Sequence, residues 1–456
     1  MQTKNVVIKF LQFVKVLSQW LVRTRLLVLV VVGILALGGC QILLDHPAVS
    51  AGITKVTLWQ GVNPPSNRDI LQRLVDRFNR EHSDIQVESL YVGQADQQMP
   101  KILAAVVGNA PPDLLWFNST ITGQLVELGA LRPLEDWLAH SQVPMQEIDQ
   151  ALFASMEYQG HTWSVPFGTN NVGVFYRPSL FKAAGIAELP KTWDELRQVA
   201  LKLTRDLNGD KRIDQHGMLL PLGKGDFTMF LWLPFMWSGG GELVNTAEQA
   251  TGAKSKTPSF NMVNQGAIAA LQFWQNLIVD GSAILSLPER GYETDAFLKG
   301  KVAMQLTGPW TLGQFKASGV DFGVFPIPAD VRQATVIGGE NLFVFKTTPE
   351  QERAAFKFAE YVLSQQFQTE WALGTGYLPV NLKARQSAEY QAYMAEQPAV
   401  KVFLEQAKHG RSRPIFPGYN RLSENVGRAI EAVLMGKSSP EAALQEAQQR
   451  LDLIFR

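Results

Sequence analysis

The sequence has little of what several protein classes need. One cysteine among 456 residues excludes a disulfide framework and a multi-cysteine metal site. Lys and Arg number 42, as do Asp and Glu, so the chain lacks the positive excess of a typical nucleic-acid binder. There is no phosphate-binding loop motif, no H-E-x-x-H, no G-x-S-x-G, and no pair of histidines at metal-ligand spacing. Hydrophobic residues nevertheless make up 46% of the chain, enough for a large core in two or three domains.

The N-terminal region differs from the rest in charge. Residues 1–44 contain no Asp or Glu, carry five basic residues, and include a wholly apolar run from Leu26 to Leu37. This order of charge, apolar run and small residues predicts a secretory signal peptide over 1–39. The segment 37–40, Leu-Gly-Gly-Cys, resembles the lipobox of bacterial lipoproteins, which predicts lipidation of Cys40 and a tether over 40–52. The alternative is an uncleaved membrane anchor, since 26–44 is uncharged and barely long enough to span.

The beginning of the mature chain predicts an α/β fold. Residues 55–60 and 86–92 have the composition of strands, and 67–82 has an apolar stripe at helical spacing. A strand–helix–strand order predicts parallel pairing with the helix as the crossover. Further along, Thr192 and Glu195 have the spacing of a capping box at a helix start.

One loop has oxygen-bearing side chains at the spacing of a calcium loop. These residues are Asp206, Asn208, Asp210 and Asp214. Lys211 and Gly217 replace the glycine and the bidentate glutamate of that pattern. An ordinary turn rich in Asp and Asn is therefore the main interpretation, and a structural Ca²⁺ is the alternative; no other cofactor is predicted.

Several motifs in a fixed order resemble one family. They include 160–166 (GHTWSVP), 181–185 (FKAAG) and 190–196 (PKTWDEL), followed by Gly300–Met304, Gly308-Pro309-Trp310, Gly338-Gly339 and Leu378-Pro379-Val380. Together they resemble the family 1 extracellular solute-binding proteins, the maltose-binding-like receptors of ABC importers. The resemblance covers nearly all of 53–456.

The resemblance implies a two-lobed periplasmic binding protein fold of class α/β, with discontinuous lobes, crossover hinge strands and a ligand cleft between the lobes. The N-terminal lobe would comprise 53–166 and 330–378, and the C-terminal lobe 167–329 and 379–456. It further implies a monomeric, non-enzymatic receptor on the extracytoplasmic or periplasmic face of a bacterial membrane, held there by its lipid anchor. Its partners would be a sugar, disaccharide or polyol glycoside and the subunits of an ABC permease, with no nucleic acid.

Candidate ligand contacts follow from sugar chemistry and from the resemblance. Aromatic rings cover the apolar faces of a sugar, while amides and Arg bind its hydroxyls. The predicted contacts are Trp59, Asn63, Phe117, Asn118, Thr120, Asn170, one of Trp232 and Trp237, Trp310, the main chain of Gly338 and Gly339, Tyr377, Arg413 and Tyr419. Trp310 is the strongest candidate, because the family stacks a sugar on an aromatic residue at that position.

Two alternatives remain open at this stage. The usual carboxylate contacts of maltodextrin binders are replaced by Asn63, Thr120 and Asn170, so maltose itself is in doubt, and an inward-pointing Arg413 would suit glycerol phosphate. A secreted carbohydrate-active enzyme is the second alternative, because paired carboxylates act in space and leave no sequence motif.

Overall fold

A computed structural model of the chain describes residues 52–244, 258–286 and 293–456. The predicted signal peptide, the lipidation site Cys40 and nearly all of the tether lie outside the described residues. Contacts divide the chain into Met1–Ile53 and one compact unit, Thr54–Arg456, and only the second unit is described below. Among the described residues, no helix is both long enough and apolar enough to cross a membrane.

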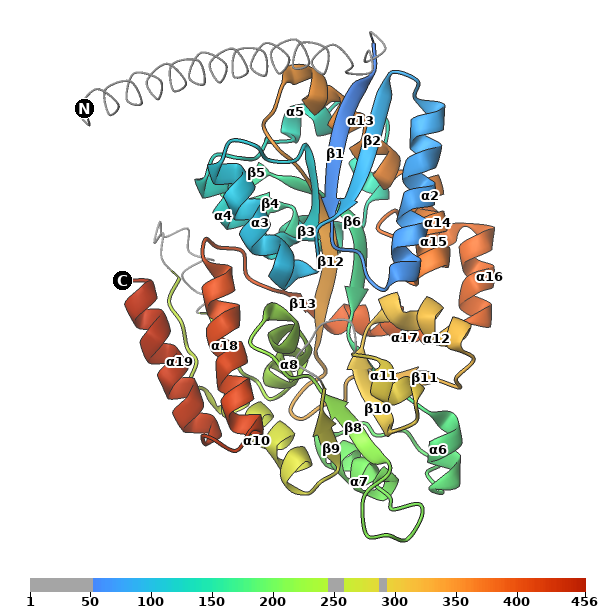
Figure 1. Cartoon of the computed structure of the whole chain (residues 1–456), viewed down its shortest axis with the longest axis vertical. Helices are drawn as coiled ribbons and strands as arrows, with labels where there is room; N and C mark the ends of the chain where they lie inside the picture. Colours follow the sequence, from blue (N-terminus) through green and yellow to red (C-terminus); the bar gives the residue numbers. More distant parts are fainter. Residues whose placement is uncertain (1–51, 245–257, 287–292) are drawn as a thin grey trace, which may run out of the picture. The chain divides into compact units, whose positions relative to one another are not determined.

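Two sheets form the framework of this unit (Figure 1). Sheet A has the order β13-β12-β3-β1-β2, with β6 also paired to β12. Its strands are β1 (Thr54–Gln60), β2 (Ile85–Tyr91), β3 (Leu114–Asn118), β6 (Ser164–Asn171), β12 (Thr335–Val344) and β13 (Gly410–Ser412). Sheet B has the order β11-β7-β10-β8-β9, with β7 (Gly173–Tyr176), β8 (His216–Leu220), β9 (Ala283–Leu285), β10 (Val302–Thr307) and β11 (Gly323–Phe325). A small hairpin joins β4 (Glu157–Tyr158) to β5 (His161–Thr162).

The opening strand–helix–strand prediction is confirmed. Strands β1 and β2 pair in parallel, and α2 (Pro65–Glu81) connects them. Its buried residues Leu71, Leu74, Val75 and Phe78 form the predicted apolar stripe. The mixed α/β class predicted from this pattern is therefore the observed one.

Helices cover both sheets. Near sheet A lie α3 (Ala95–Val107), α4 (Thr122–Glu127), α5 (Glu135–Leu138), α13 (Pro349–Leu363), α14 (Gln365–Thr375) and α15 (Leu382–Gln386). The others are α6 (Pro178–Ala183), α7 (Trp193–Leu203), α8 (Asp226–Ser238), α10 (Gln265–Val279), α11 (Asp295–Leu298), α12 (Leu312–Ser318), α16 (Ala388–Glu396), α17 (Pro398–Gln406), α18 (Tyr419–Leu434) and α19 (Pro440–Ile454). The capping box predicted for α7 is present, because Thr192 accepts a hydrogen bond from the Glu195 N–H and the Glu195 side chain reaches back.

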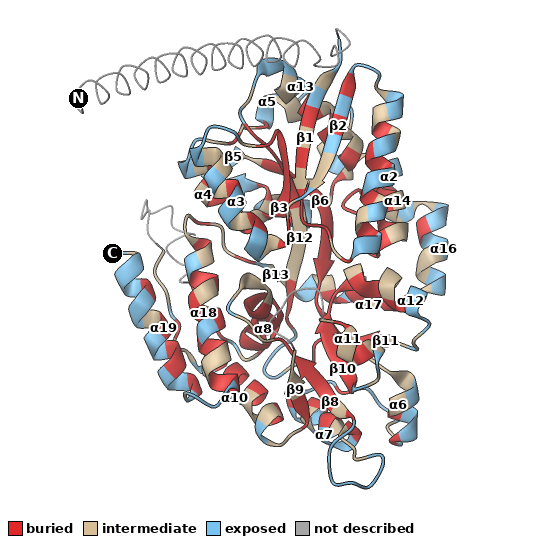
Figure 2. Ribbon diagram, in the orientation of Figure 1, coloured by how far each residue is buried: buried red, intermediate tan, exposed pale blue. Residues whose placement is uncertain are grey.

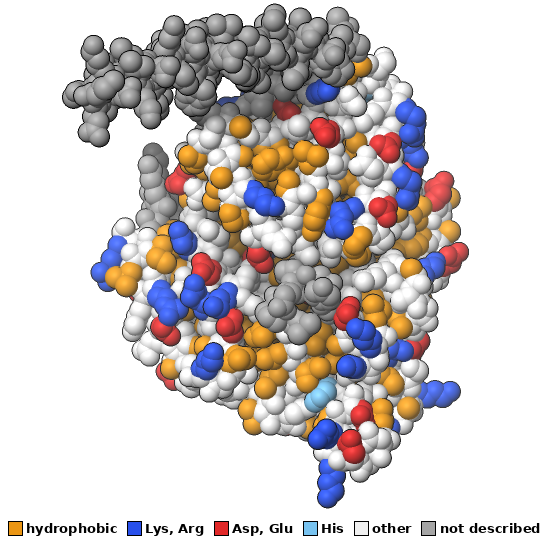
Figure 3. Space-filling model, viewed as in Figure 1, with side chains coloured by type: hydrophobic (Ala, Val, Ile, Leu, Met, Phe, Trp, Pro, Cys, Tyr) orange, Lys and Arg blue, Asp and Glu red, His pale blue; other side chains and the backbone are white. Residues whose placement is uncertain are grey.

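Separate hydrophobic clusters support the two sheets. One joins sheet A to α2, α13 and α14, and another joins sheet B to α7, α8, α10, α18 and α19. Figure 2 shows the buried strands within the more exposed helices. Figure 3 shows acidic and basic side chains interspersed on one face, in keeping with the equal numbers of the two charges.

Strands β6 and β12 carry the chain from the region of sheet A toward sheet B. They pair antiparallel from Ile337–Asn171 to Phe343–Ser164, with an irregularity at Glu340/Asn341. Pro166 and Gly168 both lie inside the continuous strand β6. The lobe boundaries proposed from the sequence stay a prediction.

Candidate ligand-binding site

A cavity of about 180 Å³ lies where the loops that follow β1, β2 and β3 approach α8, β10 and the short helix η4 (Pro309–Thr311). Its lining comes from widely separated parts of the chain. The lining residues are Gly61, Asn63, Pro64, Pro65, Gln94, Ala95, Asp96, Trp116, Asn118, Asn170, Asp226, Phe227, Phe230, Glu293, Thr294, Thr307, Trp310, Thr311, Gln314, Gly339, Glu340, Tyr377 and Arg413. Loops at the carboxyl ends of parallel strands are the usual ligand sites of α/β proteins.

The aromatic wall of the cavity centres on Trp310. Its ring lies 6.3 Å from the ring of Phe230, measured between centroids, and the two planes are inclined by 45°. Trp310 packs against the hydrophobic clusters of both sheets while its side chain remains partly exposed. The side-chain amide of Asn67 donates to the Trp310 carbonyl at 3.1 Å, which ties η4 to α2. A ring held in this way offers a flat apolar surface to a ligand.

A buried group of charges lies beside this wall. Arg413 forms an ion pair with Asp226 and lies 4.9 Å above the ring of Phe230. The Tyr419 hydroxyl donates to the other oxygen of Asp226 at 2.7 Å. Burial opposes the charge of Arg413, yet Asp226 and Tyr419 raise the pKa of the guanidinium above its usual value. Arg413 therefore remains charged and is already bound within the protein.

Glu340 is another acidic residue of the cavity lining. Burial raises the pKa of its carboxyl from 4.5 to about 7, although the charge of Arg413 and a hydrogen bond from Tyr377 oppose the shift. Its Oε2 atom is buried and has no hydrogen-bond partner in the structure. The Tyr377 hydroxyl has a pKa well above 10 because it is buried and lies beside Glu340. This carboxyl can therefore change its charge near neutral pH.

Amides complete the polar lining. Asn170, on β6, is 3% exposed, and its Oδ1 atom is buried with no hydrogen-bond partner. Asn118, at the end of β3, accepts hydrogen bonds from the N–H and the hydroxyl of Thr120. Asn63 lies in the loop after β1. Amides both donate and accept, which suits the hydroxyls of a neutral ligand.

This arrangement of two sheets with a cavity between strand-end loops matches known proteins over most of the chain. The sequence model of the bacterial extracellular solute-binding proteins matches residues 73–398. The chain belongs to this family.

Relatives of this solute-binding protein extend over nearly its whole length. The maltotriose-binding protein of Pyrococcus abyssi is 24% identical over 410 residues, which cover 88% of this chain and 82% of that protein. The sn-glycerol-3-phosphate-binding periplasmic protein UgpB of Escherichia coli O1:K1 is 24% identical over 439 residues, which cover 90% of this chain and 94% of that protein. The GacH receptor of Streptomyces glaucescens has been solved unliganded and in complex with acarbose. Its structure superposes with a TM-score of 0.76 at 24% identity, and the match covers 88% of this chain and 98% of that one. The fold is thus that of the two-lobed binding proteins.

Seven of the predicted contact residues line the cavity of this solute-binding protein. They are Asn63, Asn118, Asn170, Trp310, Gly339, Tyr377 and Arg413. They come from the loop after β1, from β3, β6 and β12, from η4, and from the segments that follow α14 and β13. Contact with a ligand is for each of them still a prediction.

The other predicted residues do not line the cavity. Side chains alternate along a strand, so Trp116 and Asn118 face the cavity, whereas Phe117 packs in the cluster behind β3 together with Trp59. Thr120 and Tyr419 do not line the cavity. They donate hydrogen bonds to Asn118 and Asp226, which do. None of these four residues lines this cavity, and their direct contact with a ligand stays a prediction.

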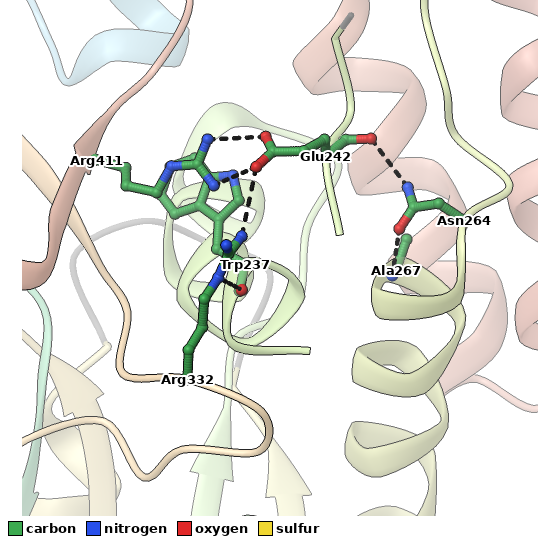
Figure 4. Close-up of polar contacts among 6 residues, drawn as sticks. All are labelled: Trp237, Glu242, Asn264, Ala267, Arg332 and Arg411. Atoms are coloured by element: carbon green, nitrogen blue, oxygen red, sulfur yellow. Dashed lines mark hydrogen bonds and ion pairs between the residues drawn. The ribbon is translucent and has the colours of Figure 1, made fainter. Parts of the chain in front are cut away.

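Both tryptophans of α8 are also placed in the core. Helix α8 buries residues all around its circumference, so it has no polar side, and Trp232 is fully buried. Trp237 lies beneath the guanidinium of Arg411, 5.0 Å from its ring centroid (Figure 4). Phe227 and Phe230, in the first half of α8, are the aromatic residues of this helix that line the cavity. Neither Trp232 nor Trp237 lines this cavity, so ligand contact by one of them stays a prediction that this structure does not favour.

The surroundings of Trp237 form a polar clamp. Arg411 makes a two-pronged ion pair with Glu242, and one of its contacts measures 2.9 Å. The Arg332 Nε donates to the Trp237 carbonyl at 2.9 Å, and Asn264 donates to the Glu242 carbonyl at 3.0 Å (Figure 4). These bonds join β13, the segment before β12, the end of α8 and the start of α10. The clamp is structural and lies apart from the cavity lining.

The glycine pair is closely surrounded by neighbouring atoms of β6 and α8. A Cβ atom at Gly338 would lie 2.3 Å from Oδ1 of Asn170 and 2.8 Å from the ring of Phe230. Gly339 has a φ of 118°, and a Cβ there would lie 2.3 Å from the Gly168 carbonyl oxygen. Gly338 does not line the cavity, and its lack of a side chain leaves room for the ring of Phe230. Gly339 allows β12 to approach the backbone of β6 closely.

Sequence reasoning missed Glu340, Asp226, Phe230 and Trp116. Glu340 lies directly after the glycine pair, and Trp116 alternates with the chosen Phe117, so strand alternation could have identified Trp116. No sequence signal distinguishes Phe230 from the other aromatic residues of a uniformly apolar helix.

The calcium-like loop is closed by its own backbone. Asp206 accepts hydrogen bonds from the N–H groups of Gly209 and Lys211, each at 2.7 Å, and Asp214 accepts one from Leu207 at 2.8 Å. Within the described ranges, no three His, Cys, Asp or Glu side chains are grouped so as to hold a metal ion. This geometry is that of a turn rich in Asp and Asn, and the Ca²⁺ alternative remains untested.

Proposed function

We propose that this solute-binding protein captures a sugar or small glycoside outside the cytoplasm and delivers it to an ABC permease. The observation that carries the proposal is the pairing, in one cavity, of an aromatic wall with amide and carboxylate groups. Trp310 and Phe230 supply the wall, and Asn63, Asn118 and Asn170 supply amides that suit hydroxyl groups. Relatives named for maltotriose support the same class of ligand.

A receptor for glycerol phosphate is the second candidate, since relatives named for that ligand align with most of the chain. A phosphate needs a free guanidinium or ammonium group. Arg413 is the one basic side chain among the described lining residues, and it is ion-paired with Asp226. Asp96, Asp226, Glu293 and Glu340 add negative charge around it. The charge of the cavity therefore favours the sugar.

Binding rather than turnover is the activity that we propose. The family consists of binding proteins, and Asp226 is engaged by Arg413 and Tyr419 instead of being available as an acid or base. We further propose lobes at 53–166 with 330–378 and at 167–329 with 379–456, which close on the ligand, and a monomer anchored through lipid on Cys40.

A thermal-shift screen of the full chain in mild detergent tests this function. A ligand that binds only the native state adds about 2.7 kcal/mol of stability at a hundredfold excess over its Kd. We expect a sugar or glycoside to raise Tm and to be recovered chemically unchanged. The Trp310→Ala variant should lose the shift, while an exposed control, Leu207→Ala, should retain it. A shift with sn-glycerol 3-phosphate and with no saccharide would contradict the proposal.

A further inference from the structure

Two side-chain oxygens on the cavity-lining strands β6 and β12 are buried and have no hydrogen-bond partner. They are Oδ1 of Asn170 and Oε2 of Glu340, which lie on the neighbouring strands β6 and β12. Asn170 pairs in register with Gly338, two positions before Glu340. Positions related in this diagonal way are roughly 7–8 Å apart, so one ligand group can serve both side chains. A buried carboxylate oxygen without a donor is costly, which makes this pair a feature that a ligand should satisfy.

The two protein donors that act on the Glu340 carboxyl are already engaged. The Tyr377 hydroxyl donates to the Glu340 carboxylate, but Oε2 of that carboxylate has no hydrogen-bond partner. The guanidinium of Arg413 is bound by Asp226 and covers the ring of Phe230. Neither group can turn to the free oxygen without breaking a buried contact. A ligand that enters the cavity can supply the missing donor.

The charge of the cavity indicates what kind of donor fits. The described lining contains four carboxylates, at Asp96, Asp226, Glu293 and Glu340, and one guanidinium, at Arg413. Groups of one sign that line a low-dielectric cleft attract ligands of the opposite sign. A neutral hydroxyl could donate one hydrogen bond, but it would bring no positive charge to stabilise the ionised form of the Glu340 carboxyl. An ammonium group has three N–H donors and a positive charge.

We propose that the cavity takes a saccharide bearing a protonated amine, with the ammonium group seated between Glu340 and Asn170. This inference rests on the proposed sugar-binding function and narrows its ligand class. The ammonium would donate to Oε2 of Glu340 and to Oδ1 of Asn170, and the rings of Trp310 and Phe230 would cover the apolar face of the sugar. Hydrogen bonds between ionised partners are about twice as strong as neutral ones, so the amine determines specificity.

Matched sugars that differ at one group test the proposal. The full chain in mild detergent is titrated calorimetrically at pH 7 with D-glucose, D-glucosamine, 6-amino-6-deoxy-D-glucose and N-acetyl-D-glucosamine. Cellobiose is compared with the disaccharide of glucosamine, and sn-glycerol 3-phosphate is included separately. At least one amine is expected to bind at least ~10-fold more tightly than its hydroxyl counterpart, the gain of a hydrogen bond to a charged group. Acetylation, which removes the charge but keeps the nitrogen, should abolish the gain.

Variants assign the preference to its residues. Glu340→Gln retains the shape of the side chain and removes its charge. The affinities for the amine and the hydroxyl ligand should then differ by no more than about threefold. Glu88→Gln, an exposed position on β2, is the matched control and should preserve the preference. Asn170→Leu removes the second acceptor and should weaken amine binding more than hydroxyl binding. Far-ultraviolet circular dichroism and Tm of each ligand-free variant establish that it is folded.

The possible outcomes distinguish a failure of this inference from a failure of the proposed sugar-binding function. Equal affinity for amine and hydroxyl ligands, or binding by no amine, overturns the inference. Binding of neutral sugars alone overturns it while leaving the sugar receptor intact. An amine preference that survives Glu340→Gln overturns the assignment to Glu340. Binding of sn-glycerol 3-phosphate with no saccharide overturns both proposals.

Discussion

The ring of Trp310 occupies the space that a side chain at Gly308 would need. A Cβ atom at Gly308 would lie 1.9 Å from Cζ3 of Trp310 and 2.4 Å from Cη2. Real Cβ atoms do not approach so closely, so the ring or the backbone would have to move. The glycine at the end of β10 therefore determines how the main aromatic surface of the cavity is presented.

Substituting Gly308 should consequently weaken ligand binding while the chain still folds. Gly308→Ala displaces the Trp310 ring, and we expect saccharide affinity to fall at least ~10-fold, since misplacing one well-packed contact commonly costs 1–2 kcal/mol. Calorimetric titration with the ligand from the thermal-shift screen measures the loss. Gly313→Ala is the control, because its added Cβ meets only the Gly374 carbonyl oxygen at an ordinary 3.4 Å. Unchanged affinity in Gly308→Ala would show that the ring is not the binding surface.

The buried ion pair of Asp226 and Arg413 should matter to stability mainly because removing one partner leaves the other charge buried and unpaired. Asp226→Asn leaves the guanidinium of Arg413, whose side chain is 7% exposed, without its ionised partner. We expect the free energy of unfolding in urea to fall by about 3 kcal/mol. Glu424→Gln removes one partner of an exposed pair with Arg428 and should change it by less than about 0.5 kcal/mol. Similar small losses in both variants would contradict this account of the buried pair.

The raised pKa of Glu340 predicts a pH dependence of stability with a definite sign. The carboxyl has a pKa of about 7 in the folded chain, against 4.5 when it is unperturbed. The folded state therefore binds the proton more strongly, so this contribution is fully present below pH 4.5 and is lost as the pH rises through 7. The shift corresponds to a contribution on the order of 3 kcal/mol. It arises from burial, and Arg413 and Tyr377 reduce it.

The Glu340→Gln variant isolates that contribution from other titrating groups. Unfolding free energies of the wild-type chain and the variant, measured between pH 4.5 and 8 without ligand, should diverge as the pH rises. The wild type should lose stability relative to Glu340→Gln across this window, and Glu88→Gln should track the wild type. A constant difference between wild type and Glu340→Gln would mean that the carboxyl does not titrate there.

The capping box of α7 should account for a small, local part of the stability. Thr192→Ala removes the oxygen that accepts the Glu195 N–H at 3.2 Å. We expect a loss of about 1 kcal/mol in the free energy of unfolding. Thr192→Ser retains the hydroxyl and should lose much less. Ligand affinity should not change, because α7 does not contribute to the cavity lining.

Local features of this chain were predictable because nearby residues determine them. The apolar stripe of α2, the parallel pair β1 and β2, and the Thr192–Glu195 cap all follow from spacing along a helix or strand. The family could also be recognised, since its motifs occur in a fixed order over most of the chain. Trp310, placed by that resemblance, does line the cavity.

The polar half of the cavity depended on contacts that the sequence does not display. Arg413 could have faced a ligand or solvent, and only its pairing with Asp226, 187 positions away, decides which groups remain available. The tryptophans of α8 are equivalent by composition, but helix packing buries Trp232 and leaves Phe230 at the cavity.

The sequence by itself thus determined the fold class, the local elements and the family, because periodicity, caps and motif order act over short separations. Tertiary structure alone decided which side chains share the cavity and which of them still lack a partner. The pKa of Glu340 is the clearest example. It depends on burial and on the positions of Arg413 and Tyr377, which only the folded chain brings together.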